Sequence, residues 1–89
     1  MKKHLTILTG ASRGMGLAMA EQLCGPDQQL LCISRGQSDE LTAIANQQGA
    51  HLVQWQADLA QPGAVATRLT QWLDTVDASQ LSSATLINN

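Results

Sequence analysis

Three glycines and an arginine lie together near the start of the chain, in the stretch ILTGASRGMGLAMA at positions 7–20. The glycines are Gly10, Gly14 and Gly16, and Arg13 lies between the first two. Because glycine has no Cβ, such a turn can bend sharply and bring backbone N–H groups close to a phosphate, particularly where it opens a helix. The spacing G-x-x-x-G-x-G matches neither G-x-G-x-x-G nor a P-loop. A glycine-rich connection that binds no ligand is the alternative at this point.

A second arginine follows another apolar run. Ser34 and Arg35 come directly after residues 29–33, which read QLLCI. Arg13 and Arg35 together could hold a phosphate group by charge-assisted, bidentate hydrogen bonds, which a lysine would supply less specifically. An ordinary solvated loop arginine is the alternative for Arg35 if it is taken alone.

The other reactive side chains form no recognisable catalytic or metal motif. Cys24 and Cys32 lie in apolar surroundings without zinc-like spacing, so we expect buried, reduced thiols. His4 and His51 each lie at the head of an expected strand and fall in no nucleophile motif. The serines have no partner base near them in the sequence: Ser12, Ser34, Ser38, Ser79, Ser82 and Ser83. The sequence therefore predicts no catalytic residue and no metal ligand in this chain.

Alternating strand and helix patterns place these residues. Short apolar or alternating runs that end at turn residues predict strands at 4–9, 29–34 and 51–57, and a last strand starting at 85–87. Residues at helical spacing predict helices between them: from Met15 to a stop at Gly25-Pro26, from an N-cap at Ser38 to Gly49, and from Pro62 to Val76. The order β-α-β-α-β-α-β with short connections predicts a parallel sheet with helices on both faces, the first half of a doubly wound α/β fold.

The spacing of the apolar residues differs from one expected element to the next. In the first helix, apolar residues recur at helical spacing: Met15, Ala18, Met19 and Leu23. The nearly continuous apolar centre of residues 29–34 is typical of a strand covered on both faces. Residues 51–57 alternate between polar and apolar, which indicates a strand nearer an edge of the sheet.

Length and charge exclude some classes of function. The chain has 89 residues, with 5 basic and 7 acidic side chains and a net charge of −2, so we expect no basic face that follows a nucleic-acid backbone. No apolar run is long enough to predict a membrane span. Because the chain is short and residues 84–89 look like a strand without its continuation, we expect residues 1–89 to be the amino-terminal part of one longer domain.

Four short motifs occur in a fixed order along the chain: TGASRGMG at residues 9–16, Ser34-Arg35, Asp58-Leu59 and Asn88-Asn89. Together they resemble the short-chain dehydrogenase/reductase family, whose glycine signature is Thr-Gly-x-x-x-Gly-x-Gly. The last two residues look like the first half of that family's Asn-Asn-Ala-Gly motif. The resemblance runs through all 89 residues and implies a Rossmann-type fold whose first half binds a nicotinamide cofactor.

The resemblance also implies a set of cofactor-binding residues. Those of the glycine turn would wrap the cofactor pyrophosphate: Gly10, Ala11, Ser12, Arg13, Gly14, Met15 and Gly16. Asp58 would contact the adenine with Leu59 beside it, and Asn89 would lie by the nicotinamide-side ribose. Structural alternatives stay open, because Asp58 could cap the turn before Pro62, and Asn88 and Asn89 could satisfy backbone groups at a strand end.

The end of the second strand bears on which nicotinamide cofactor is bound. A protein that selects NAD generally places a carboxylate there, which accepts from the ribose hydroxyls and would repel a 2′-phosphate. Here Ser34 and Arg35 hold that place, and Arg13 is a second cation, so we expect NADP. Asp39 or Glu40 lies roughly 20 residues beyond the glycine turn and is the competing ribose-binding acid. Both are better explained as first-turn helix residues.

Catalysis in this family depends on a serine and a Tyr-x-x-x-Lys pair, and this chain contains no tyrosine. We therefore expect the NADP-binding portion of an enzyme that reduces a carbonyl to an alcohol, inactive by itself. The connection at 24–29 is similar to the sepiapterin reductase and benzil reductase branch. A 3-oxoacyl carrier-protein reductase and a non-catalytic NADPH sensor are the alternatives. The expected setting is cytoplasmic, with a small carbonyl substrate, no nucleic acid or membrane partner, and a homodimer or homotetramer as the intact protein.

Overall fold

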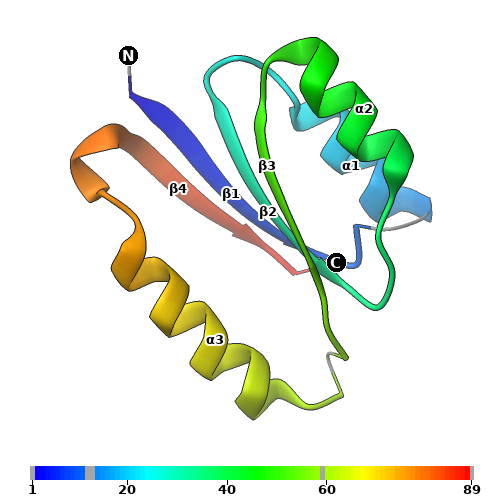
Figure 1. The fold of residues 1–89 in the computed structure, drawn as a ribbon, viewed down its shortest axis with the longest axis vertical. Coiled ribbons are helices and arrows are strands. Elements are labelled where there is room, and N and C mark those ends of the chain that lie inside the picture. Colours follow the sequence, from blue (N-terminus) through cyan, green and yellow to red (C-terminus); the bar gives the residue numbers. More distant parts are fainter. Residues whose placement is uncertain (1, 12–13, 59, 89) are drawn as a thin grey trace.

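The computed structural model of the protein describes residues 2–11, 14–58 and 60–88. Its elements follow the predicted order along the chain: β1 (Lys3–Thr9), α1 (Gly14–Leu23), β2 (Gln28–Ser34), α2 (Asp39–Gln48), β3 (His51–Gln56), α3 (Pro62–Thr75), a short 3-10 helix (Ala78–Gln80) and β4 (Leu81–Ile87). Figure 1 shows α1 and α2 on one face of the sheet and α3 on the other. The predicted doubly wound α/β architecture is confirmed.

The strands form one parallel sheet in the order β3-β2-β1-β4. β1 pairs with both β2 and β4, so the order of the strands reverses at β1. β3 lies at one end of this order, as its alternating pattern predicted. In open α/β sheets, ligands bind outside the carboxyl ends of the strands at such a reversal. The fold thus points to the carboxyl ends of β1 and its neighbours as the place for a site.

Each face of the sheet has its own hydrophobic core. Leu8, Leu30 and Cys32 face α1 and α2, together with Leu41 of α2. The alternate residues of the same two strands face α3, among them Leu5, Ile7, Leu31 and Ile33. Because β1 and β2 are covered on both faces, their sequences are apolar at successive positions rather than at every second one.

Trp55 joins β3 to α3. The ring of Trp72, on α3, meets the Trp55 ring edge-on with centroids 6.0 Å apart. The Arg68 guanidinium lies 4.2 Å from the centroid of the Trp55 ring, on which it stacks as a cation. These contacts fix α3 to the outer part of the sheet, next to the turn that follows β3.

The first helix buries its small residues. Gly16 and Ala20 are its buried residues, with Met19 and Leu23 packed partly against the core. Met15 is 74% exposed and Ala18 is exposed, so the spacing that predicted the helix does not mark its buried face. Small residues face the sheet because α1 crosses it closely, and helical spacing alone does not distinguish the close face from its neighbours.

β4 begins at Leu81, four residues earlier than the predicted start at Thr85. Most of its side chains are exposed, including Leu86 at 65%, because the helices cover the other strands. The ladder with β1 and polar contacts hold its first half: His4 Nδ1 bonds to the Ser83 hydroxyl, and His4 Nε2 lies 3.0 Å from Thr85 Oγ1. Serines at 82 and 83 gave no apolar pattern from which this half could be predicted.

Both predicted ends of α2 are confirmed. The Ser38 side chain accepts a hydrogen bond from Leu41 N at 3.1 Å, and Gly49 takes the left-handed conformation with φ of 74° at the other end. Left-handed backbone costs a residue with a Cβ about 1–2 kcal/mol. Glycine at the end of α2 therefore satisfies a conformational requirement of the chain.

We expect Gly49→Ala to lower the free energy of unfolding by about 1 kcal/mol, because alanine would have to keep the left-handed conformation. The matched control is Gly63→Ala in α3, where an added Cβ meets open space. That change should raise stability by roughly 0.5 kcal/mol, because alanine favours helix over glycine. Urea unfolding of both variants measures the difference, and effects of the same sign would contradict this account.

A second stability prediction concerns pH. Burial, and to a lesser extent the nearby Cys24, raises the pKa of the Cys32 thiol from an ordinary 9.0 to about 12. The unfolded chain therefore loses this proton first, so the contribution of Cys32 is fully present below about pH 9 and is lost as the pH rises towards 12. We expect the urea midpoint to fall over this window. Cys32→Val removes the titrating group at similar volume, and an undiminished fall in that variant would refute the assignment.

Candidate functional site

The sequence motifs meet at one edge of the sheet. Gly10 follows β1, Arg35 follows β2, Asp58 lies just beyond β3, and Asn88 follows β4. Since the strands are parallel, all four positions lie at their carboxyl ends. The strand order reverses at β1, and in this class of sheet ligands bind beyond the carboxyl ends of the strands at such a reversal.

The glycine turn has the backbone that only glycine adopts easily. Gly10 and Gly14 have φ values of 70° and 63°. Gly10 N donates to Ile33 O of β2 over 2.9 Å, which holds the start of the turn against the sheet. A Cβ at Gly14 would meet nothing within 4 Å, so its φ, rather than crowding inside the protein, requires glycine there. Ala11 and Gly16, which belong to the turn, are buried.

Several of the predicted cofactor-binding residues lie outside the described part of the chain. Ser12 and Arg13 of the glycine turn, Leu59 after β3, and Asn89 at the end are among them. Their assignment to a cofactor stays a prediction. Met15 is described, and its side chain lies exposed at the beginning of α1.

The amino ends of α1 and α2 differ in a way that matters for binding an anion. α2 begins with the Ser38 cap and carries Asp39 and Glu40 in its first turn. These carboxylates complement the helix dipole, which confirms the first-turn role for both residues. The first turn of α1 has no acidic residue. Its backbone N–H groups therefore meet no carboxylate of their own helix and suit an external anion.

Arg35 and Asp58 face each other across the ends of β2 and β3. The Arg35 guanidinium nitrogen lies 3.8 Å from Asp58 Oδ1, and the two side chains are 82% and 52% exposed. An ion pair so exposed contributes little to stability, so both groups are available to a ligand. Asp58 Oδ1 also accepts from Ala60 N over 2.9 Å, which confirms the turn-capping role that was left open for it.

One contact at this edge was missed by the sequence analysis. The Thr9 hydroxyl donates to Asn88 Oδ1 over 2.9 Å, joining the carboxyl ends of β1 and β4. The two residues are 79 positions apart, and no local pattern indicates that they meet. This hydrogen bond links the ends of the neighbouring strands β1 and β4, directly before the glycine turn.

The hollows beside α2 and beside Asp58 are small, whereas a larger one of about 350 Å³ lies at the amino ends of β2 and β3, lined by Gln29, His51 and Gln80 with their neighbours. One hollow of about 190 Å³ lies between α2 and β3, and another of about 160 Å³ is lined by Asp58, Val65 and Arg68 with their neighbours. Sites for whole cofactors are generally larger than about 300 Å³. Neither of the two smaller hollows has the volume for a whole dinucleotide.

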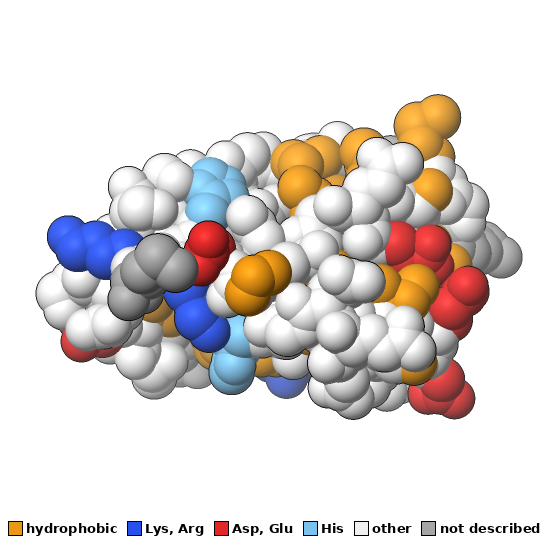
Figure 2. Space-filling view, turned by 90° about the horizontal axis from the view of Figure 1, so that it is seen from above, with side chains coloured by type: hydrophobic (Ala, Val, Ile, Leu, Met, Phe, Trp, Pro, Cys, Tyr) orange, Lys and Arg blue, Asp and Glu red, His pale blue; other side chains and the backbone are white. Residues whose placement is uncertain are grey.

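Charge is mixed on the face of the molecule that Figure 2 shows. Lys and Arg side chains lie towards its left side and most Asp and Glu side chains towards its right side. No extended basic surface is visible among the described side chains in this view. Among residues 2–11, 14–58 and 60–88, no three His, Cys, Asp or Glu side chains lie close enough together to hold a metal ion. No helix in these residues is long and apolar enough to cross a bilayer.

Parallel strands in the order 3-2-1-4, with a glycine turn that opens the first helix at their carboxyl ends, define a Rossmann-type fold. The solved structure of a short-chain dehydrogenase/reductase from Burkholderia vietnamiensis matches it with a TM-score of 0.71 at 31% identity, over 94% of this chain and 38% of that one. A 3-oxoacyl-(acyl-carrier protein) reductase from Brucella melitensis, solved in complex with NAD, matches with a TM-score of 0.68 at 22% identity, over 83% and 29%. At that identity the match shows the fold alone.

The chain belongs to the short-chain dehydrogenase/reductase family. A curated relative, the (S)-benzoin-forming benzil reductase of Bacillus cereus, is 32% identical over 83 residues, which are 93% of this chain and 33% of the relative. No family model matches the chain. The chain spans about a third of the length of the relatives that it matches. The predicted family membership is thus confirmed.

Proposed function

We propose that the protein binds NADP(H) along the carboxyl edge of its sheet and forms the cofactor-binding part of an oxidoreductase that reduces a carbonyl group to an alcohol. The observation that carries the choice of cofactor is the exposed Arg35 guanidinium at the end of β2. An Asp or Glu at the end of β2 would accept hydrogen bonds from the ribose hydroxyls of NAD and so favour that cofactor. This position is occupied by Ser34 instead. Arg13 would add a second cation.

The described residues fit a dinucleotide. Gly10 and Gly14 give a turn without side chains, and α1 begins there with no carboxylate in its first turn. The pyrophosphate would accept hydrogen bonds from that turn, with Gly16 allowing α1 to pack closely on the sheet. Asp58 would turn from Arg35 to the adenine when Arg35 engages the 2′-phosphate. Leu59 and Asn89 keep their proposed places beside the adenine and by the nicotinamide-side ribose.

The bound cofactor would supply the hydride, and this chain's residues would hold it in place. The benzil reductase relative, named for the formation of (S)-benzoin, supports a carbonyl substrate for this protein too. A 3-oxoacyl carrier-protein reductase is the alternative within the same reaction class. We further propose a cytoplasmic protein that assembles as a homodimer or homotetramer, the common arrangement of soluble oligomers.

Calorimetric titration with NADP⁺ and NAD⁺ tests the proposal. We expect NADP⁺ to bind at least about tenfold more tightly, the factor that one additional charge-assisted contact supplies. Saturating NADP⁺ should also raise the melting temperature, because a ligand that binds only the folded state stabilises it. Absence of both effects, or tighter binding of NAD⁺, would contradict the assignment. Because residues 1–89 contain no tyrosine, loss of NADPH absorbance on addition of benzil tests the reaction class only in a protein that also supplies the family's Tyr-x-x-x-Lys pair.

A further inference from the structure

Arg35 lies in a short segment, residues 35–38, that joins β2 to α2. Its own side chain is 82% exposed and meets Asp58 at 3.8 Å, so its side-chain contacts do not fix its position. The two ends of the segment must do so. What holds those ends therefore decides how accurately the guanidinium is presented to a phosphate.

The β2 end is held by Ser34. Ser34 O accepts from Ala57 N of the turn after β3 over 2.8 Å, and the buried Ser34 hydroxyl donates to Gly36 O over 3.2 Å. Gly36, the second residue of the segment, is thus hydrogen-bonded to Ser34, the last residue of β2.

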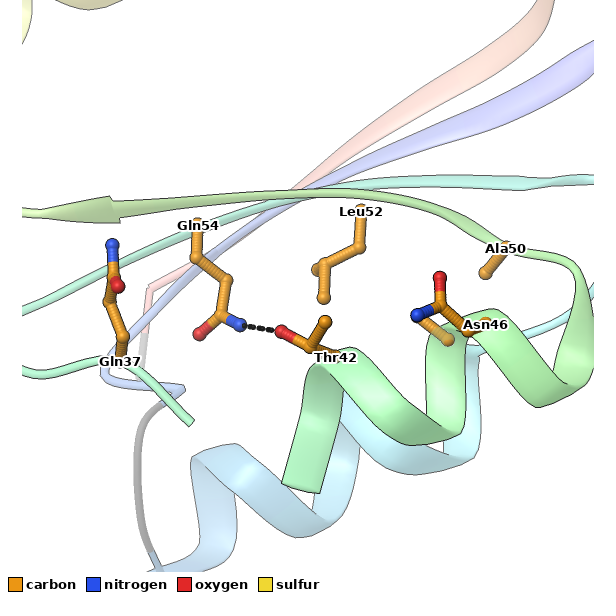
Figure 3. Close-up of a pocket in the computed structure, with 7 residues that line it drawn as sticks. Gln37, Thr42, Asn46, Ala50, Leu52 and Gln54 are labelled. Atoms are coloured by element: carbon orange, nitrogen blue, oxygen red, sulfur yellow. Dashed lines mark hydrogen bonds between the residues drawn. The ribbon is translucent and has the colours of Figure 1, made fainter. Parts of the chain in front are cut away.

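The α2 end is held by Gln54, a half-buried residue of β3. Gln54 Oε1 accepts from the backbone N–H of Ser38 over 3.0 Å. Gln54 Nε2 donates to Ser38 O over 2.9 Å and to Thr42 Oγ1 over 2.9 Å. Figure 3 shows the Gln54 and Thr42 side chains pointing towards each other across the hollow between α2 and β3.

This arrangement allows one orientation of the Gln54 amide. Reversing the amide would place its NH₂ group against the Ser38 N–H, which is itself a donor. Ser38 is buried, and its hydroxyl already caps α2 by accepting from Leu41 N. Without Gln54, the Ser38 N–H would lose the acceptor that the structure gives it, and burial makes such a loss costly.

We propose that Gln54 is a positioning residue for cofactor selectivity: it clamps Ser38 and so fixes the segment that presents Arg35 to the 2′-phosphate. This inference rests on the proposed NADP(H) function and deepens it. Gln54 acts through Ser38 rather than by touching the phosphate. NAD carries no 2′-phosphate, so its binding depends far less on this segment.

Calorimetric titration of Gln54→Leu with NADP⁺ and NAD⁺ tests the clamp. Loss of the anchoring bonds should leave the segment in its binding-competent arrangement about a tenth of the time, which weakens NADP⁺ binding about tenfold. NAD⁺ binding should change less than about twofold, and this second titration also reports that the protein is folded. Thr42→Val removes one of the three contacts and should give an intermediate loss. Amide exchange at residues 35–38 should be faster in Gln54→Leu.

The matched control is Gln56→Leu, because Gln56 is the same residue type on the same strand and its side chain is exposed. It should leave both affinities unchanged. Equal losses of NADP⁺ and NAD⁺ in Gln54→Leu would show a merely structural role and overturn the inference. A wild-type preference for NADP⁺ that survives in Gln54→Leu would refute the inference alone, whereas a wild-type protein with no such preference would refute the proposed function as well.

Discussion

Replacing Arg35 by aspartate should weaken NADPH binding by about 100-fold, which corresponds to ~2.7 kcal/mol, and leave NADH binding nearly unchanged. The guanidinium lies exposed at the end of β2, where a 2′-phosphate would accept charge-assisted hydrogen bonds from it. Aspartate removes those bonds and adds like-charge repulsion, while the same carboxylate can accept from the ribose hydroxyls of NADH. Titration of the variant with each cofactor measures the ratio of the two affinities.

Two controls separate this local effect from the change in overall charge. Lys2→Asp makes the same change in net charge before the start of β1, at the opposite end of the strands, and should leave the ratio of affinities unaltered. Arg35→Gln removes the charge without adding repulsion, so its loss of NADPH affinity should be smaller. If Arg35→Asp weakens both cofactors equally, Arg35 does not select the 2′-phosphate.

The parts of the fold that local rules determine were predicted from the sequence. The apolar run at residues 29–34 indicated a strand covered on both faces, and β2 is buried on both. The ends of α2 follow from Ser38 and Gly49, because a hydroxyl cap and a left-handed glycine act within one helical turn. Each of these signals lies within a few residues of the feature that it determines.

The missed features depend on residues that are distant in sequence. The start of β4 is held by pairing with β1 and by contacts to His4, about eighty positions away. The Thr9–Asn88 bond has a similar separation. Gln54 is 16 residues from Ser38, on another strand, and a glutamine in an alternating strand gives no sign of a partner. The type of site could thus be predicted from motifs, but the contacts that position its residues could not.

Replacing Gly14 by valine should abolish binding of NADPH and NADH alike, with a loss above about 100-fold for each. Valine would have to take a φ of 63° at the first residue of α1, and left-handed backbone is a severe outlier for a β-branched residue. If α1 kept its start, the new side chain would project into the open space beside the turn, where the pyrophosphate is proposed to lie. If α1 shifted instead, its N–H groups would no longer point to that place.

The pattern of loss distinguishes this residue from Arg35. Both nicotinamide cofactors carry the pyrophosphate, so Gly14→Val should lower both affinities without changing their ratio, whereas Arg35→Asp should change the ratio. Gly14→Ala, which adds a single methyl group, should fall between wild type and valine. Gly63→Val puts the same side chain at an exposed glycine of α3, on the other face of the sheet from α1, and should leave cofactor binding intact. Calorimetric titration with both cofactors measures all of these affinities. If Gly14→Val binds NADPH with the affinity of the wild type, the glycine turn does not hold the pyrophosphate.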